Sequence, residues 1–345
     1  MPDFDTVTLL GVKKRQKPFE AFFKNIFFGN EMFSDSEKVA IDELVPNLRL
    51  LPFVSPIVAG TVRRQDGSRT TSYQPPYLKP LDMVSPKNMM KRLPGEALNG
   101  EMSPAQRLNA TVVMLLDDQE KAIVRTEEKM CVDAVLTGKF VVEGSEEHEA
   151  MEVDYGRSPE NNVTLIGAER WSQLDKETTD MAGIFDEFAD LTTGIPDTVI
   201  FDKKAYSLFA SFKSVKDSLD TKVANGDSEL MLAPEIKKVV QYKGRFGQYD
   251  IYVYNGEYEE NDGTRKRLMP EYGMVMGPRQ YDGVMAYGAI QDVEAGADGI
   301  ARAKRWPKVW VNPNPSARYL MTQSAPLPIM PDADEFFVGI IDGPV

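Results

Sequence analysis

The clearest hydrophobic pattern in the chain runs from residue 103 to residue 138, where apolar side chains recur mostly at helical spacing. We expect this apolar stripe to face the core, and its members are Leu108, Val112, Leu116, Ile123 and Met130. Gln119 is expected at an exposed position of the same helix. At 1.5 Å per residue the helix is about 50 Å long. Because a small domain rarely holds such a length, the pattern predicts a spine that carries other elements.

Signals at both ends of this segment favour the same helix. Ser103 can act as the N-cap, Pro104 occupies the first helical position, and Gln106 completes a capping box. Gly138 can end the helix in the left-handed backbone conformation that favours glycine. The helix is therefore predicted to span 103–138.

The residues before position 58 predict an arm more than a compact domain. Two apolar clusters, 19–28 and 41–51, are separated by glycine, asparagine and the polar stretch 34–37. Clusters this aromatic do not remain in solvent. They must pack either on the body of the same subunit or on a neighbouring molecule.

Residues 58–93 predict a projecting hairpin. A strand over 58–64 and a returning strand over 72–78 flank Asp66 and Gly67, a dipeptide typical of tight turns. The segment holds several prolines and few large aliphatic residues. It cannot form a core of its own, so we expect it to extend away from the body.

The tip of this hairpin is basic in an otherwise acidic chain. Arg63, Arg64 and Arg69 crowd around the predicted turn at Asp66 and Gly67. One interpretation is a solvated loop, in which these charges have no partner. The functional interpretation is that all five residues contact a neighbouring subunit and that the arginines pair with its carboxylates.

After the long helix, short strands alternate with short helices, which is typical of an α+β fold. Asp202 is a predicted N-cap for one amphipathic helix that carries Tyr206, Phe209, Phe212, Val215 and Leu219. The other predicted elements are a hairpin over 139–143 and 150–155, a helix over 181–191, a turn at 261–263, and strands over 198–201, 239–242, 249–254, 272–276 and 335–341.

Composition excludes several classes of protein. The chain of 345 residues carries 40 Lys and Arg against 53 Asp and Glu, a net charge of −13. Such a charge disfavours gripping nucleic acid through its phosphates, although it permits a container whose wall repels packed DNA. The N-terminus lacks the pattern of a signal peptide, and no apolar run is long enough to span a membrane. One cysteine fits a reducing compartment such as a bacterial cytosol.

A search for chemistry finds no catalytic, cofactor or metal motif. His148 is the single histidine and lies among glutamates in a predicted loop, while Cys131 is expected to be a buried structural thiol. The glycines at 244 and 247 are expected to mark a turn between two strands, since no phosphate-loop lysine follows them. The acidic clusters 143–149 and 332–335 are interpreted mainly as solvated loop charge, otherwise as contacts between subunits.

The basic and aromatic stretch from Arg302 to Trp310 also has two interpretations. In isolation the alternation resembles a nucleic-acid patch. In an acidic chain, strand packing combined with charge pairing between subunits is the favoured interpretation.

Short motifs along nearly the whole chain resemble those of a known family. They are 53–60 (FVSPIVAG), 78–80 (LKP), 92–94 (RLP), 156–162 (GRSPENN), 199–202 (VIFD), 211–213 (SFK), 219–221 (LDT), 323–327 (QSAPL) and 334–336 (DEF). In number and order they resemble the major capsid proteins of the phage lambda type, the major capsid protein E family. None of the motifs is a catalytic signature.

This resemblance implies an α+β fold of the Hong Kong 97 type. The implied parts are an N-terminal arm (1–57), an extended hairpin loop (58–93), a peripheral domain containing the spine helix (94–179), an axial domain (180–320), and a C-terminal strand that returns to the peripheral domain (321–345). The hairpin 139–155 and the C-terminal strand would share the peripheral sheet.

The resemblance also implies a structural protein that assembles as hexamers and pentamers into the icosahedral head of a tailed phage. Implied partners are further copies of the chain, a separate scaffolding protein, a decoration protein, the portal protein, and packaged double-stranded DNA enclosed without sequence-specific binding. No membrane is implied. The shell would be assembled in the host cytoplasm and persist in the virion, and no fused scaffold is expected because the chain opens at the arm.

Two alternatives remain from the sequence. One keeps the fold and makes the chain an encapsulin-like compartment shell, and the other is an α/β enzyme of unknown reaction. The scarcity of histidine and the projecting arm and hairpin weigh against the enzyme.

Overall fold

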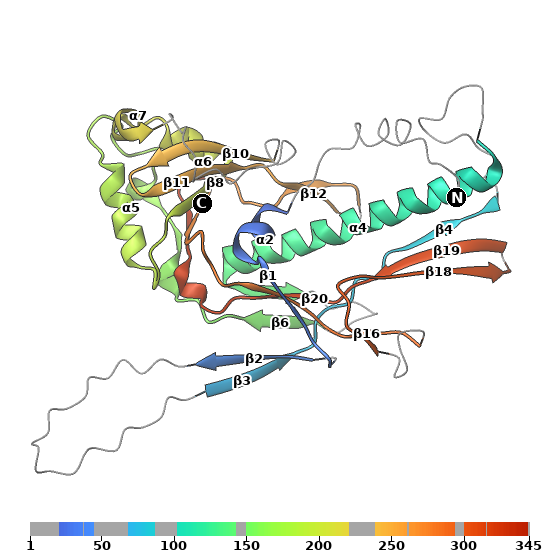
Figure 1. The fold of residues 1–345 in the computed structure, drawn as a ribbon. Coiled ribbons are helices and arrows are strands. Elements are labelled where there is room, and N and C mark those ends of the chain that lie inside the picture. Colours follow the sequence, from blue (N-terminus) through green and yellow to red (C-terminus); the bar gives the residue numbers. More distant parts are fainter. Residues whose placement is uncertain are drawn as a thin grey trace, which may run out of the picture.

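The structure is a computed structural model that describes residues 21–36, 38–44, 68–86, 102–142, 150–220, 239–260, 262–293, 300–314 and 316–343. One long helix, α4 (Pro104–Thr137), crosses the molecule, with a large mixed sheet near its C-terminal end and a smaller sheet along its other half (Figure 1). The remaining helices are α2 (Phe22–Phe27), α5 (Met181–Asp190), α6 (Lys203–Phe209), α7 (Lys213–Ser218) and the 3-10 turns η1 (Pro159–Asn161), η2 (Gly167–Glu169) and η4 (Ala333–Glu335).

The predicted capping box and terminator of α4 are confirmed. The Ser103 hydroxyl accepts a hydrogen bond from the Gln106 amide, and the Gln106 side chain accepts one from the Ser103 amide. Gly138 ends the helix with φ +68°. Of the apolar stripe, Ile123 and Met130 are buried, whereas Leu108, Val112 and Leu116 are only partly covered. The core contact of the helix is therefore concentrated in its C-terminal half.

The prediction that Gln119 faces solvent is wrong. Its side chain is 2% exposed, and its amide nitrogen donates to Asp82 Oδ2 at 2.7 Å. Its amide oxygen accepts from Thr322 Oγ1 at 2.7 Å. The reason is tertiary: a sheet formed by residues far along the chain covers this side of α4, and the amide satisfies polar groups of that sheet.

The large sheet has seven strands and two apolar faces. Their order is β7 (Asn162–Thr164), β21 (Phe337–Ile340), β14 (Gly273–Gly277), β8 (Thr198–Phe201), β11 (Tyr249–Tyr254), β10 (Val240–Phe246) and β9 (Leu219–Asp220). Val199 and Phe201 pack with Phe185 of α5 and Phe209 of α6 on one face. Ile200 of the same strand packs on the opposite face with the apolar residues of α2 and the end of α4. The sheet is thus the middle of three layers.

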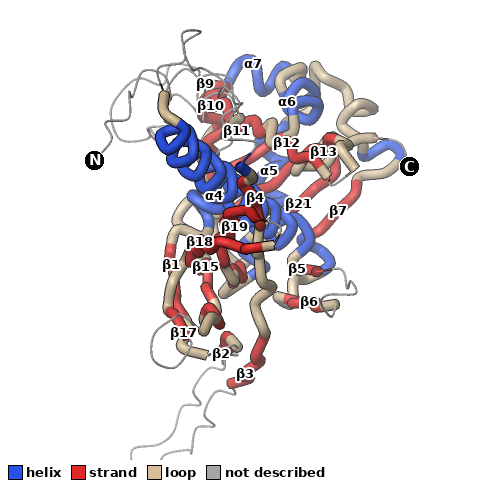
Figure 2. Tube along the Cα trace, turned by 90° about the vertical axis from the view of Figure 1, so that its right-hand side faces the viewer, coloured by secondary structure: helices blue, strands red, loops and turns tan. Residues whose placement is uncertain are grey.

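Smaller sheets complete the architecture (Figures 1 and 2). Two have three strands: β1 (Asn30–Phe33), β15 (Val284–Tyr287) and β20 (Pro326–Ile329) in one, and β18 (Trp306–Pro313), β19 (Ser316–Gln323) and β4 (Leu81–Val84) in the other. Four have two strands: β2 (Val39–Leu44) with β3 (Ser68–Tyr73), β5 (Lys139–Val142) with β6 (Met151–Asp154), β12 (Glu257–Glu259) with β13 (Arg265–Arg267), and β16 (Ile290–Gln291) with β17 (Ile300–Ala301).

Several predicted elements are confirmed, and one predicted helix is wrong. The hairpin after α4 forms as β5 and β6, and α5, β8 and β11 lie at the predicted positions. Asp202 caps α6 as expected, since its carboxylate accepts the Lys204 amide. The helix breaks at Ala210, however, and α7 begins after Phe212. The Lys213 amide bonds to the carbonyl of Lys176 and not to its own helix, so a tertiary contact replaces the helical one.

The returning strand predicted over 72–78 forms earlier, as β3, and pairs with a segment that the prediction did not include. Strand β3 pairs along its whole length with β2, from Val39 opposite Tyr73 to Leu44 opposite Ser68. Residues 39–44 had been assigned to the arm. The proposed strand 58–64 lies outside the described residues, and so do Arg63, Arg64, Asp66 and Gly67.

Two placements near the C-terminus need correction. Strand β21 does not join the hairpin β5–β6 but pairs with β14 and β7 in the large sheet. Phe337 and Val338 are buried on opposite faces of that sheet, and an interior strand satisfies both. Strands β18 and β19 were expected with the axial residues 180–320, yet β19 packs on α4 and pairs with β4.

Candidate assembly site

The most prominent feature outside the packed body is the ribbon of β2 and β3. It extends away from the rest of the molecule, as both views show (Figures 1 and 2). At its base Val39 is buried among Met130 of α4, Phe140 of β5 and Leu327 of β20. A two-stranded ribbon is marginally stable alone. Among the described residues neither strand has a second partner, so the backbone at both edges of the ribbon can pair with another molecule.

A second exposed feature is the outer face of the sheet β18–β19–β4. Asp82 and Thr322 reach Gln119 of α4, so their side chains define the inner face. Side chains alternate along a strand, and register partners share a face. Leu81 and Met83 therefore point outward, with exposed fractions of 55% and 51%.

Aromatic residues extend this apolar surface across the sheet. Met83 is opposite Tyr319, and Tyr319 is opposite Trp310. The rings of Trp310 and Tyr319 stack with centroids 5.6 Å apart. We call Leu81, Met83, Trp310, Tyr319 and Met321 the outer apolar face. Aromatic and methionine side chains are enriched in protein interfaces, so this face suits contact with another protein.

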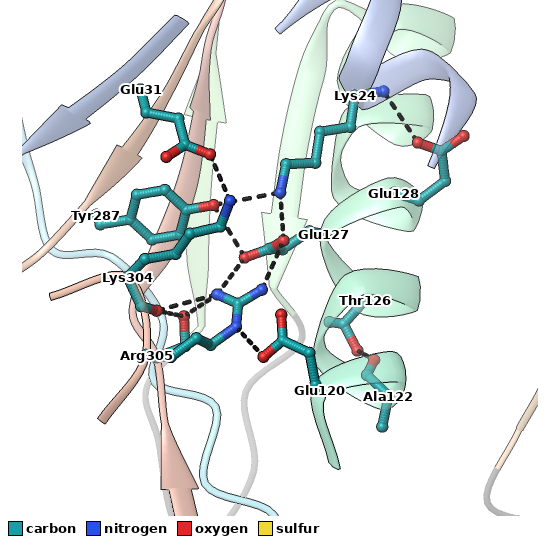
Figure 3. A network of polar contacts seen from close by, with 11 residues as sticks. Lys24, Glu31, Glu120, Ala122, Thr126, Glu127, Glu128, Tyr287, Lys304 and Arg305 are labelled. Carbon is teal, nitrogen blue, oxygen red and sulfur yellow. Dashed lines mark hydrogen bonds and ion pairs between the residues drawn. The ribbon is translucent and has the colours of Figure 1, made fainter. Parts of the chain in front are cut away.

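A third feature is a buried charged junction that fastens α2 to α4 (Figure 3). Glu127 is fully buried and accepts from both terminal nitrogens of Arg305, at 2.8 and 3.0 Å. The Lys24 ammonium lies 2.6 Å from the same carboxylate, and the Tyr287 hydroxyl donates to it at 3.2 Å. We call these residues, together with Glu128, the arm junction. It joins four segments that are distant in sequence.

Charge balance explains how the junction tolerates burial. Burial alone would raise the pKa of Glu127, but Arg305 and Lys24 together hold it below the usual value. Arg305 also donates to Glu120 at 2.8 Å, and the Lys304 ammonium pairs with Glu31. Buried ions are stable only when paired in this way. The junction therefore depends on all of its partners being present.

The basic stretch around Arg302 pairs within the subunit. Arg302 pairs with Asp35, and Lys308 lies 2.9 Å from Asp292. Together with the pairs of Lys304 and Arg305, these contacts give each basic residue an intramolecular partner, and the expected pairing between subunits at these positions stays a prediction. The expected strand is present as β18, which begins at Trp306.

The predicted burial of the one cysteine is confirmed. Cys131 is free and fully buried. Gly244 lies within β10 and Gly247, with φ +59°, in the turn that follows, which corrects the expected turn by placing part of it in the strand. Within the described ranges no cluster of histidine, cysteine or acidic residues is arranged to hold a metal ion, and no helix is long and apolar enough to cross a membrane.

The two acidic clusters differ in what the structure says of them. Residues 143–149, with His148, lie outside the described part. In the second cluster, Asp334 accepts from the amide and hydroxyl of Ser158 and from the Asn161 amide group. Asp334 therefore stabilises the contact between its own loop and the segment 158–161, and it is not a solvated loop charge.

Apart from Arg305, which belongs to the basic stretch, the junction residues were not predicted from the sequence. Glu127 lies four positions after Ile123 and four before Cys131, both buried, so it falls on the core stripe of α4. That spacing was a usable signal. The sequence around Lys24 and Arg305 gives no signal that these side chains are buried, because their burial depends on elements more than 100 residues away along the chain.

The features described so far define a class of protein: an elongated subunit whose ribbon and outer face lie outside its own core, with no cluster of metal-binding residues in the described part. Comparison with known proteins identifies the family. The family model for phage major capsid protein E matches residues 5–340, and the chain belongs to this family.

Relatives and solved structures agree with this membership. The chain is 38% identical to the major capsid protein of Escherichia phage lambda and 39% identical to that of Escherichia phage N15, in each case over 97% of this chain and 98% of the relative. A crystal structure of an E. coli CFT073 prophage capsid protein is 25% identical, with a TM-score of 0.77 over 98% of this chain and 99% of that chain.

The fold extends to a more distant relative. The capsid structure of cyanophage P-SCSP1u matches with a TM-score of 0.50 and 6% identity, over 93% of this chain and 88% of that chain. The fold is of the Hong Kong 97 capsid type. The chain is a structural shell protein of the virion and not an enzyme, which removes the enzyme alternative. Relatives from phages over nearly its full length favour a phage shell over a bacterial compartment.

Proposed function

We propose that this subunit assembles as hexamers and pentamers into an icosahedral phage head, with the ribbon β2–β3 lying on a neighbouring subunit. The observation that carries the proposal is the ribbon itself, which extends away from the body beyond its buried base at Val39. The outer apolar face supports it, because that face has the composition of an interface core.

The division of the chain into roles belongs to the same proposal. The residues before about position 39 act as the arm, those from there to 93 as the extended loop, the region around α4 as the peripheral domain, and the large sheet with α5, α6 and α7 as the axial domain. Since β2 pairs with β3, the extended loop in this proposal begins near residue 39.

The remaining partners follow from the role of a shell. A separate scaffolding protein guides assembly, a decoration protein clamps the outside, and a portal protein replaces one vertex. Packaged double-stranded DNA is enclosed without sequence-specific contacts. The net charge of −13 supports this last point, since an acidic wall does not grip phosphates.

The test combines assembly with charge reversal at the ribbon. Expressed with its scaffold, the wild-type protein should form closed shells visible by electron microscopy. The triple variant Arg63→Glu, Arg64→Glu and Arg69→Glu should keep the circular dichroism of the wild type but form few or unstable shells. Salt at 1 M should weaken the same contacts, because the screening length falls to about 3 Å.

A matched control reverses three charges elsewhere. Lys203, Lys213 and Lys216 are exposed on α6 and α7, and their joint replacement by Glu should leave shell formation intact. Normal shells from the ribbon variant would refute the role of the arginines. A wild-type protein that stays monomeric at high concentration with its scaffold would refute assembly altogether.

A further inference from the structure

Glu128 occupies an unusual position at the start of the arm helix α2. Its two carboxylate oxygens accept the backbone amides of Phe23 and Lys24, each at 2.9 Å. The natural N-cap residue, Ala21, offers no side-chain hydrogen bond. Glu128 of α4 therefore caps α2 from a distance of more than 100 residues along the chain and satisfies amides that the helix leaves unpaired.

No positive side chain neutralises this carboxylate among the residues that the structure describes. Lys24 directs its ammonium to Glu127, and the third donor to Glu128 is the Tyr254 hydroxyl of β11, at 2.9 Å. The other titratable groups in the surrounding cluster are Cys131, one turn further along α4, and the tyrosines Tyr252, Tyr254, Tyr281 and Tyr287, and burial raises the pKa of each of them. Glu127 is held as an anion by two cations, whereas Glu128 has only dipoles.

We propose that Glu128 makes docking of the arm helix α2 proton-linked, so that the arm is held more tightly in mildly acidic than in neutral or alkaline solution. The proposal concerns the folded subunit and does not depend on shell formation. Glu128 acts here as a positioning residue for the arm.

The direction follows from the two states of the carboxyl group. Burial raises the pKa of Glu128 from 4.5 to about 7, although the amides of Lys24 and Phe23 and the Tyr254 hydroxyl favour the charged form. When the arm leaves, the group meets water and its pKa returns toward 4.5. The docked state thus binds the proton more tightly, so docking is strongest below pH 4.5 and weakens as the pH rises to about 7.

A change in hydrogen bonding accompanies the proton. The protonated group must donate one hydrogen bond, and the Tyr254 hydroxyl can turn from donor to acceptor to receive it. The group can then keep contacts to the arm amides without a buried charge. The geometry therefore accommodates both states, as a proton-linked contact requires.

The chain contains its own reporter for this test. Cys131 is the single cysteine, is fully buried, and belongs to the same cluster as Phe22, Phe23 and Phe27 of the arm. Undocking of α2 should expose it. The experiment measures labelling of Cys131 by a methanethiosulfonate reagent in the full chain between pH 5 and pH 8, relative to the denatured protein at the same pH.

We expect protection of Cys131 in the wild type to fall by about 70-fold between pH 5 and pH 8, the ratio that a pKa change from 4.5 to about 7 gives over that range. Glu128→Gln should make protection independent of pH in this range, since it cannot ionise. Glu169→Gln, an exposed position on η2, is the matched control and should retain the wild-type dependence.

A second variant covers the case in which Glu128→Gln fails to fold, as judged by circular dichroism. Tyr254→Phe removes one donor to the carboxylate and should move the midpoint of the change upward in pH. Protection that is constant from pH 5 to pH 8 in the wild type would overturn the proposal. So would a Glu128→Gln protein with the wild-type dependence, or a Cys131 that is unprotected at every pH.

Discussion

Arg302 and Arg305 lie three positions apart on one segment and differ in their surroundings. The Arg302 ion pair with Asp35 is exposed on both sides, whereas Arg305 meets a carboxylate with no exposed surface. Exposed pairs contribute little, because solvent screens both charges. A buried pair is costly to break, because the remaining ion stays desolvated.

We therefore expect Arg305→Met to lower the free energy of unfolding by about 3–5 kcal/mol. Arg302→Met is the matched control and should cost only about 0–1 kcal/mol. Denaturant unfolding of isolated capsomers measures both. Equal losses would show that Glu127 does not depend on Arg305.

The stripe of α4 offers a second comparison between single side chains. Ile123 is 2% exposed, whereas Leu116 is only partly covered. Ile123→Ala should cost about 2–5 kcal/mol, the range for deleting a buried aliphatic side chain. Leu116→Ala should cost clearly less in the same unfolding experiment. A larger loss at Leu116 would mean that neighbouring subunits cover that half of the helix in capsomers.

At the scale of elements, the end of α4 depends on one glycine. Gly138 has φ +68°, and a Cβ added there would lie 2.6 Å from the Cβ of Arg157. Arg157 cannot move freely, since it donates to the carbonyl oxygens of Val135 and Ala333. The turn that joins α4 to β5 therefore leaves no space for a side chain at position 138.

Gly138→Ala should destabilise the subunit by more than about 1 kcal/mol, which is the usual cost of the left-handed conformation alone. Gly167→Ala is the control, because Gly167 has φ +59° but no atom within 4 Å of an added Cβ. Thermal unfolding of both variants separates the cost of the left-handed backbone, which both share, from the cost of the steric clash with Arg157, which only Gly138→Ala has. Equal losses would show that Arg157 moves aside.

At the scale of the whole molecule, burial is distributed unevenly. The large sheet is covered on both faces, while Leu81 and Met83 of the outer apolar face are exposed. A monomer gains nothing from open apolar surface, but a shell buries such surface at every subunit contact. The elongated form of the subunit is therefore consistent with stability shared between copies.

The double variant Leu81→Lys and Met83→Lys should leave the subunit folded but reduce shell formation, because each lysine places a charge in an apolar contact. Ile195→Lys is the control, at a site that is 79% exposed and distant in sequence from the outer face. Electron microscopy and sedimentation of scaffold-assembled samples measure the outcome. Unimpaired shells from the double variant would show that this face stays in solvent.

The sequence by itself determined the elements whose signals are local. The capping box at Ser103, the stop at Gly138, the hairpin after it and the cap at Asp202 all depend on residues a few positions apart, and each is present. The family resemblance likewise used short motifs in order along the chain. It indicated the fold class and the role, both of which the comparisons show.

The tertiary structure decided which distant segments meet. The pairing of β2 with β3, the place of β21 in the large sheet, and the break between α6 and α7 depend on contacts far apart along the chain. The same holds for Gln119, which the sequence predicted to be exposed, and for Glu128. Their burial is stable only because partners from other elements satisfy their hydrogen bonds, and no local pattern contains those partners.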